Sequence, residues 1–158
     1  MSHKTLQRQK PIPISTARTA WGLLQAVKRA IRADPLRVDM RRFYGHCGPE
    51  EGGPACGTVG CFAGWVNILA GYRGGNYEDA QAKMLLGPTL DYYLASGAHV
   101  FNSGYGDQCA VTRTGSKAHA DALVARIDRF MRRNAPALKA RRLKPSPGGR
   151  MLISRASR

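Results

Sequence analysis

The sequence predicts a mainly α-helical fold: a compact single domain of about five helices around a central buried helix, with basic flexible termini. Three observations lead to this prediction. Residues 56–71 are apolar on nearly every side, and a helix without a polar face must be enclosed by its neighbours. Residues 15–33 and 116–134 carry apolar side chains at intervals of three and four, which is typical of amphipathic helices. The Lys and Arg residues gather toward the two ends of the chain.

The central helix is expected over residues 58–70. Thr58 is placed to be its N-cap, and Gly71 is placed to end it in a left-handed backbone conformation. Small residues recur along one side of this helix and allow another element to approach closely; they are Gly60, Gly64, Asn67 and Gly71. Bulky apolar side chains such as Trp65 and Phe62 fill the other sides. We therefore expect this helix to form the core.

Two amphipathic helices are expected to pack around it. The first begins at Ser15 or Thr16 as the N-cap and runs to about Ala33, where the pair Asp34-Pro35 stops it. The second begins at Ser116 and ends near Asn134, shortly before a proline. Both have one apolar face, so both predict packing against the central helix.

The segments between these helices are shorter. A helix is expected from Asn76, as its cap, through Leu86, and another from Thr89 to Ala95. Residues 98–115 are rich in Gly, Ser, Asn and Asp and predict a loop, with anchors into the core at Val100, Phe101 and Tyr105. The resulting organisation is a basic N-terminal arm over 1–14, a helical domain over 15–134 and a basic C-terminal tail over 135–158, disordered from residue 145 onward.

The charge distribution indicates a polyanionic partner. The net charge is +15, with +8 over residues 1–42, −4 over 43–112 and +11 over 113–158. Clustered arginine favours bidentate contacts to phosphate. The sequence therefore predicts low-specificity nucleic-acid binding, to RNA or DNA, by a basic segment near the C-terminus; its residues are Arg126, Arg129, Arg132, Arg133, Lys139, Arg141, Arg142 and Lys144.

Other partners fit the same charge. The basic ends also suit an acidic protein partner, as expected of a phage inhibitor of a host system or a virion component. No base-reading motif accompanies the arginines, so any nucleic-acid binding is expected to be salt-dependent and weakly sequence-specific. Tyrosines that suit base stacking as well as the edge of the core are Tyr44, Tyr72, Tyr77, Tyr92, Tyr93 and Tyr105.

The cysteines offer a candidate metal site. Cys47, Cys56 and Cys61 lie close together in sequence, beside His46, and His99 and Cys109 follow later. Zinc is held by four nitrogen or sulfur ligands, commonly from two close pairs. The irregular spacing here lacks the paired CxxC pattern, so packing thiols are an equally simple interpretation. Zinc is the one cofactor that the sequence suggests.

The same cysteines suggest a second chemistry. Cys56 and Cys61 fall at the expected start of the central helix, where backbone N–H groups stabilise a thiolate. With His99 as base and Asn102 or Asp107 to orient it, this order resembles that of papain-like cysteine hydrolases. No oxyanion residue is identifiable, and a Cys56–Cys61 disulfide is a further alternative. We expect a protein that is not an enzyme.

One motif resembles a known group. The run Cys56-Gly57-Thr58-x-x-Cys61-x-Ala63-Gly64-Trp65, followed by Leu69-Ala70-Gly71, is similar to that of a group of small phage and bacterial proteins. The resemblance covers roughly residues 38–131, with Val38-Asp39-Met40 before the motif and Leu86-Gly87 after it. It implies a compact helical fold and a phage origin, and it carries no activity to transfer.

The sequence also bears on location. It contains no run of about twenty apolar residues that would cross a bilayer. The basic start of the chain is not followed by a hydrophobic region, as it would be in a secretory signal. We therefore expect the protein in the cytoplasm, of a bacterial host if it is phage-encoded, or in a virion.

Overall fold

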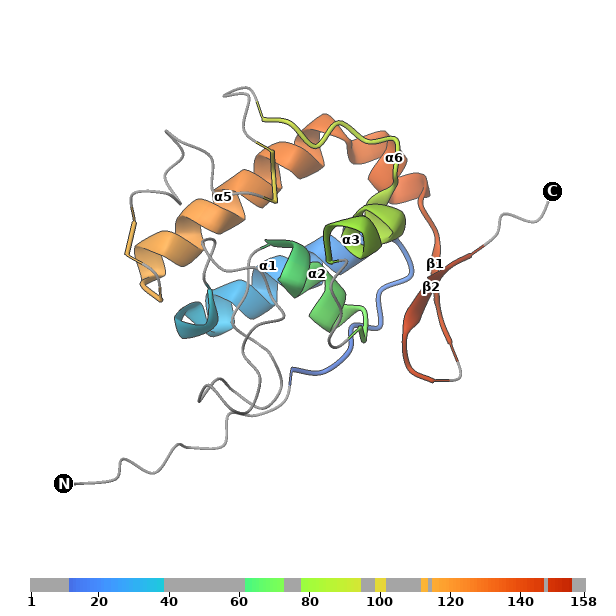
Figure 1. The fold of residues 1–158 in the computed structure, drawn as a ribbon, viewed down its shortest axis with the longest axis horizontal. Helices are drawn as coiled ribbons and strands as arrows, with labels where there is room; N and C mark the ends of the chain where they lie inside the picture. Colours follow the sequence, from blue (N-terminus) through green and yellow to red (C-terminus); the bar gives the residue numbers. More distant parts are fainter. Residues whose placement is uncertain are drawn as a thin grey trace.

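The computed structural model describes residues 12–38, 62–72, 78–94, 99–101, 112–113, 115–146 and 148–154. This part of the chain is mainly helical and compact, with five α-helices and one two-stranded sheet (Figure 1). The helices are α1 (Ala20–Ala33), α2 (Phe62–Leu69), α3 (Glu78–Leu86), α5 (Lys117–Arg133) and α6 (Ala135–Ala140). A short 3-10 helix, η1 (Pro35–Arg37), follows α1, and the strands are β1 (Leu143–Pro145) and β2 (Met151–Ile153). No helix in the described ranges has both the length and the apolar character to span a bilayer.

The central helix α2 is confirmed as the middle of the core. All eight of its residues are buried, and the side chains of Trp65 and Phe62 are fully enclosed. Helix α1 packs on it from one direction and α3 from another. The Phe62 ring reaches Phe130 of α5, with 6.2 Å between the ring centroids. An apolar helix of this kind is stable only inside such an enclosure.

Gly71 ends α2 as expected, with φ at +85°. The amide of Gly71 donates to the carbonyl of Ile68, and that of Tyr72 donates to the carbonyl of Asn67. These bonds satisfy carbonyls that the helix end would leave without partners. The expected N-cap Thr58 and the start of the central helix lie outside the described residues, as do Asn76 and Tyr105.

Helices α1 and α5 form an antiparallel pair. The start of α1 lies at the end of α6, because Ala20 donates its amide hydrogen to the carbonyl of Arg141. The middle of α1 meets the middle of α5 through an ion pair of Lys28 with Asp128. Beyond the end of α1, the amide of Gly115 donates to the carbonyl of Val38. The two long helices therefore lie side by side (Figure 1).

The helix predicted over 116–134 is confirmed, but the start predicted for the first helix is wrong. Ser116 caps α5 by accepting the amide hydrogen of His119 at 3.1 Å. In contrast, α1 begins at Ala20, and its N-cap is Thr19, which accepts from Gly22 at 3.1 Å. Ser15 donates its amide hydrogen instead to Leu69 of α2. This contact keeps residues 12–18 out of the helix.

The predicted helix from Thr89 to Ala95 is also wrong. Its described part is a turn followed by an extended stretch, in which Tyr93 forms an isolated antiparallel bridge with His99. Tyr92 is buried and Tyr93 is exposed, as expected for neighbours in an extended chain. The anchors Val100 and Phe101 are confirmed, since both are fully buried.

The prediction of disorder from residue 145 onward is wrong for residues 145–146 and 148–154, which belong to a docked hairpin. Strands β1 and β2 pair antiparallel, with Lys144 opposite Leu152. The amide of Met151 donates to the carbonyl of Ala70 at 2.8 Å, and the Tyr72 hydroxyl donates to the carbonyl of Met151 at 2.6 Å. Core residues from this region and from the expected N-terminal arm are Ile12, Leu138, Leu143 and Met151. Residues 1–11 lie outside the described part.

The docking of this hairpin leads to a prediction about Gly71. A Cβ at Gly71 would lie 2.9 Å from the carbonyl oxygen of Gly149 and 3.2 Å from the Cα of Arg150, at a left-handed φ. We expect Gly71→Ala to lower the free energy of unfolding by about 2 kcal/mol, because strain and a backbone clash coincide. Gly148→Ala is the matched control, because its nearest neighbour would be 3.9 Å away. Equal urea midpoints for the two variants would show that the hairpin does not dock on α2.

Candidate nucleic-acid interface

The described carboxylates are largely held in ion pairs. Asp128 pairs with Lys28 at 2.5 Å, Asp34 with Arg37 at 2.8 Å, and Asp91 with Arg133 at 2.9 Å. Asp121 pairs with Lys117 within α5. These pairs remove negative charge from the surface near the long helices. The described surface near the long helices is therefore positively charged overall, because most of its carboxylates are neutralised by these pairs.

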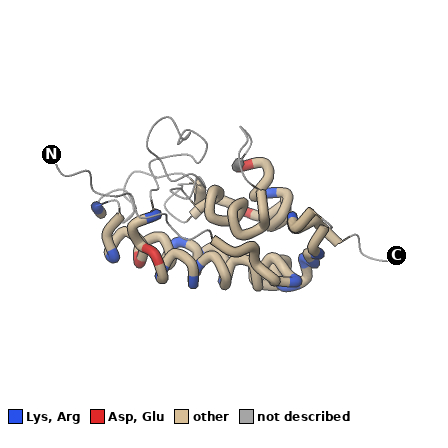
Figure 2. The backbone as a smooth tube through the Cα atoms, turned by 90° about the horizontal axis from the view of Figure 1, so that it is seen from below, with Lys and Arg blue, Asp and Glu red and all other residues tan. Residues whose placement is uncertain are grey.

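One group of exposed cations lies along the α1–α5 pair. We call the group formed by Arg29, Arg32, Arg129 and Arg132 the helix ridge; all four are exposed. On α1, Arg29 and Arg32 follow Lys28 toward the end of that helix. On α5, Arg129 and Arg132 follow Asp128 toward the opposite end, because the helices are antiparallel. Figure 2 shows the backbone with its Lys and Arg positions, many of which lie along the lower edge of that view together with some acidic positions.

The length of the ridge is comparable to a few phosphate steps of a nucleic-acid strand. The Lys28–Asp128 pair marks its middle, and Arg32 and Arg132 each lie one turn beyond that pair, in opposite directions. One helical turn is about 5.4 Å, so these two arginines are about 11 Å apart along the helix axes. Successive phosphates of one strand advance about 3.4 Å along a duplex. The length of the ridge therefore corresponds to about three phosphate steps of a duplex strand.

Arg126 does not belong to this surface, which corrects the predicted site. Its side chain is fully buried, and its guanidinium donates to the carbonyl of Val100 at 3.3 Å. Arg126 lies three residues after Leu123 and four before Phe130, so it falls on the apolar face of α5. A buried guanidinium cannot reach a phosphate. Its role is to join α5 to the segment around Val100.

Two further predicted residues are engaged in holding the fold together. Arg141 donates to the carbonyls of Leu85 and Met84 in the last turn of α3, where a cation complements the negative end of the helix. Arg133 donates to the carbonyl of Tyr93 at 2.8 Å in addition to its ion pair with Asp91. Both contacts tie the C-terminal helices to the middle of the chain.

The other predicted residues are exposed. Lys139 lies over the ring of Trp21, with its ammonium 4.8 Å from the ring centroid, and this cation–π contact joins α6 to the start of α1. The backbone of Arg142 forms an isolated antiparallel β-bridge with that of Thr19, and Lys144 is an exposed residue of β1. Together with Arg129 and Arg132 these three residues keep the position that the sequence predicted. They extend the basic surface beyond the end of the helix ridge.

Arg29 and Arg32 were missed as site residues. The sequence places them off the apolar stripe of the first helix, and this is the signal that they are exposed. Their relation to Arg129 and Arg132 depends on the antiparallel pairing of α1 with α5. No pattern in the sequence specifies that pairing.

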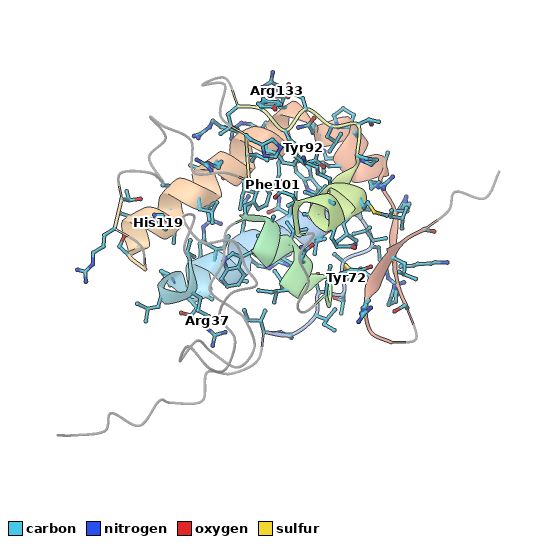
Figure 3. The ribbon with its side chains drawn as sticks, in the orientation of Figure 1. Arg37, Tyr72, Tyr92, Phe101, His119 and Arg133 are labelled. Carbon is cyan, nitrogen blue, oxygen red and sulfur yellow. The ribbon has the colours of Figure 1, made fainter. Side chains whose placement is uncertain are left out.

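An aromatic cluster borders the basic surface at the end of α5. The Tyr92 ring stacks on Phe130 at 5.2 Å and 25°, and the His99 ring stacks on Tyr92 at 5.8 Å and 12°. Phe101 contacts both Tyr92 and His99. The Tyr92 hydroxyl donates to the carbonyl of Gly87 at 2.8 Å, and burial raises the pKa of Tyr92 well above its usual range. Figure 3 shows Arg133, Tyr92 and Phe101 in succession from the outer edge toward the centre.

His99 is held as a neutral ring within this cluster. Its Nδ1 accepts the amide hydrogen of Phe101 at 3.3 Å. Burial lowers the pKa of His99, and the positive charge of Lys83 lowers it further, while Asp79 acts in the opposite direction. The ring therefore carries no charge near neutral pH.

This shift predicts how stability depends on pH. Because the folded state disfavours the protonated ring, the unfolded chain binds more protons below about pH 6.5. The contribution of His99 to stability is therefore present above that pH and is lost as the pH falls toward the folded-state pKa. An NMR titration should give His99 a lower midpoint in the folded protein than in urea, and His99→Phe should flatten the stability curve below pH 6.5. An equal or higher folded midpoint would contradict this prediction.

The predicted metal and nucleophile residues lie outside the described residues. These are His46, Cys47, Cys56, Cys61, Asn102, Asp107 and Cys109. Within the ranges that the structure does describe, no three His, Cys, Asp or Glu side chains converge as metal ligands would. Of the proposed catalytic set, only His99 is described, and it packs among aromatic rings.

Comparison with known proteins adds no relative. Neither protein-family models, nor curated proteins, nor solved structures give a match to this chain. The fold and the surface therefore define the protein only as a compact, mainly helical one with a strongly basic face.

Proposed function

We propose that the protein is an accessory protein that binds nucleic acid with low sequence specificity, through the helix ridge. The observation that carries this proposal is the separation of charge on the described surface. The carboxylates near the long helices are paired with Lys28, Arg37, Lys117 and Arg133. The four ridge arginines are exposed on two antiparallel helices.

The composition of the ridge favours a phosphate backbone over an acidic protein. All four cations are arginines, whose planar guanidinium matches phosphate geometry in a bidentate manner. Protein interfaces depend on large apolar anchors near their centre. Between the ridge arginines, α5 instead exposes the small side chain of Ala125, and α1 presents Gln25 and Ala26. The surface is thus suited to charge neutralisation, and the described residues of α1 and α5 place no large apolar anchor at its centre.

The way in which the described residues form the ridge accounts for the proposed low specificity. The ridge side chains come from the sides of α1 and α5, and bases are read by side chains that enter a groove. Contacts restricted to the backbone position the nucleic acid without reading its sequence. We therefore expect similar affinities for unrelated sequences of equal length.

Salt dependence tests the proposal directly. Binding is measured by fluorescence anisotropy with a labelled oligonucleotide. In a plot of the logarithm of the affinity against the logarithm of the salt concentration, the slope should be about −3 or steeper, since each neutralised phosphate contributes about −0.9. A flat response between 50 and 200 mM salt would remove the proposal. Copurification from lysate that survives both nuclease treatment and high salt would indicate an acidic protein partner instead.

A further inference from the structure

Tyr93 is the most exposed of the described aromatic side chains next to the basic surface. Its side chain is 59% exposed, whereas that of Tyr92 beside it is 5% exposed. Aromatic rings usually bury most of their area, since they supply much of the energy of cores and interfaces. An exposed ring within a rigid aromatic cluster therefore requires an explanation. The groups around Tyr93 indicate which kind of ligand would bind to this ring.

The backbone that carries Tyr93 is firmly held. The amide of Tyr93 donates to the side chain of Asp91 at 2.9 Å, and its carbonyl accepts from Arg133 at 2.8 Å. Arg133 is in turn paired with Asp91, and an antiparallel bridge joins Tyr93 to His99. These contacts fix the backbone of Tyr93 before any ligand arrives. A preorganised side chain loses little entropy on binding.

The ring of Tyr93 packs against a cluster of other aromatic rings. It meets His99 edge to face, with 5.4 Å between the centroids and 86° between the planes. His99 stacks on Tyr92, and Tyr92 stacks on Phe130 of α5. The cluster thus runs from the buried interior to one exposed ring. The exposed ring of Tyr93 is therefore supported by a packed aromatic cluster.

Positive charge lies beside this surface. Arg133 holds the backbone of Tyr93, and Arg129 of the helix ridge lies one turn earlier on α5. Residues four apart on a helix are neighbours on its surface. A strand whose phosphates lie on the ridge therefore passes close to Tyr93.

We propose that Tyr93, supported by His99, is a base-stacking site that makes single-stranded nucleic acid the preferred ligand of the helix ridge. This inference rests on the proposed function, because the ridge supplies most of the affinity. In a duplex each base is already stacked on both of its faces within the helix. Only an unpaired base can lie on the Tyr93 ring, and it can be any base, because every base has a π face.

The test compares two ligands and three proteins. Anisotropy is measured with a labelled 20-nucleotide strand and with the same strand in a duplex, for the unmodified protein, Tyr93→Ala and Tyr93→Phe. We expect Tyr93→Ala to weaken single-strand binding by about 5- to 150-fold, the range reported for loss of one stacked base, and to leave duplex binding unchanged. Tyr93→Phe should bind like the unmodified protein, since it retains the ring.

A second measurement follows the base itself. A single strand that contains 2-aminopurine should lose fluorescence when it binds the unmodified protein, and Tyr93→Ala should abolish this quenching. Unchanged single-strand affinity in Tyr93→Ala, or an equal loss for both ligands, would overturn the stacking site while leaving the helix ridge in place. Failure of the unmodified protein to bind either ligand would overturn the proposed function as well. Circular dichroism checks that all three proteins fold alike.

Discussion

Trp65→Ala is expected to lower the free energy of unfolding by about 3–5 kcal/mol. Trp65 is fully buried in α2 and is the largest of the fully enclosed side chains. Its removal leaves a cavity at the centre of the fold, where neighbouring helices close only in part. Since domains of this size are stable by about 5–15 kcal/mol, the loss is a large share of the total. Urea unfolding followed by circular dichroism measures it.

Two further variants show that this effect comes from packing. The indole N–H of Trp65 is buried and has no hydrogen-bond partner in the structure as described. Trp65→Phe therefore loses contact area but no hydrogen bond, and we expect it to cost clearly less than the alanine variant. Leu36, which is 75% exposed, is the matched surface control, with an expected change below about 0.5 kcal/mol on replacement by alanine. A Trp65→Ala variant as stable as Leu36→Ala would contradict the buried position of α2.

Neutralising the helix ridge is expected to have the largest effect on binding. Replacing Arg29, Arg32, Arg129 and Arg132 together by glutamine should make the salt slope shallower by up to about 3.6, because four phosphate contacts are lost at about 0.9 each. Between 50 and 200 mM salt, the affinity of the unmodified protein should therefore fall by up to about 150 times more than that of the variant. Anisotropy over a salt series measures both quantities.

The control for this variant removes the same charge elsewhere. Lys83, Arg113, Lys117 and Arg150 lie on α3, before and at the start of α5, and in the hairpin. Their replacement by glutamine lowers the net charge equally, so a general charge effect would weaken binding to the same extent. We expect the control to keep most of the salt slope. Equal slopes in the two variants would show that net charge, rather than the ridge, determines binding.

The parts of the fold predicted from sequence were those set by local rules. The period of α5, its cap at Ser116 and the left-handed Gly71 each depend on a few neighbouring residues. Hydrophobic content identified α2 as central for the same reason. Such features need no knowledge of distant contacts.

The errors arose where distant contacts overrode local preference. Ser15 is a good cap, but its amide pairs with Leu69 of α2, and the helix begins at Thr19 instead. The hairpin after Leu143 is stabilised by docking on Ala70 and Tyr72, which lie over seventy positions earlier in the chain. Neither contact can be predicted from the sequence of the segment that makes it. A basic, Pro- and Gly-rich stretch therefore suggested disorder.

The candidate surface was predicted in part. Among the residues that charge clustering selected, Arg129, Arg132 and Lys144 are exposed, whereas Arg126 is buried. The helical position of Arg126 between Leu123 and Phe130 indicated burial, and the charge alone did not. The contribution of α1 to the ridge depends on its pairing with α5. The position of Tyr93 depends on a different long-range contact, in which Arg133 donates to its carbonyl.

The most direct test of the helix ridge is an NMR titration of the protein with a short oligonucleotide. We predict that the largest shifts fall on the side-chain signals of Arg29, Arg32, Arg129 and Arg132. The signals of buried Arg126, and of Arg141 at the end of α3, should move little, because both are held by backbone carbonyls. Shifts confined to the cations of α3 and the hairpin, with the ridge unaffected, would contradict the proposed interface.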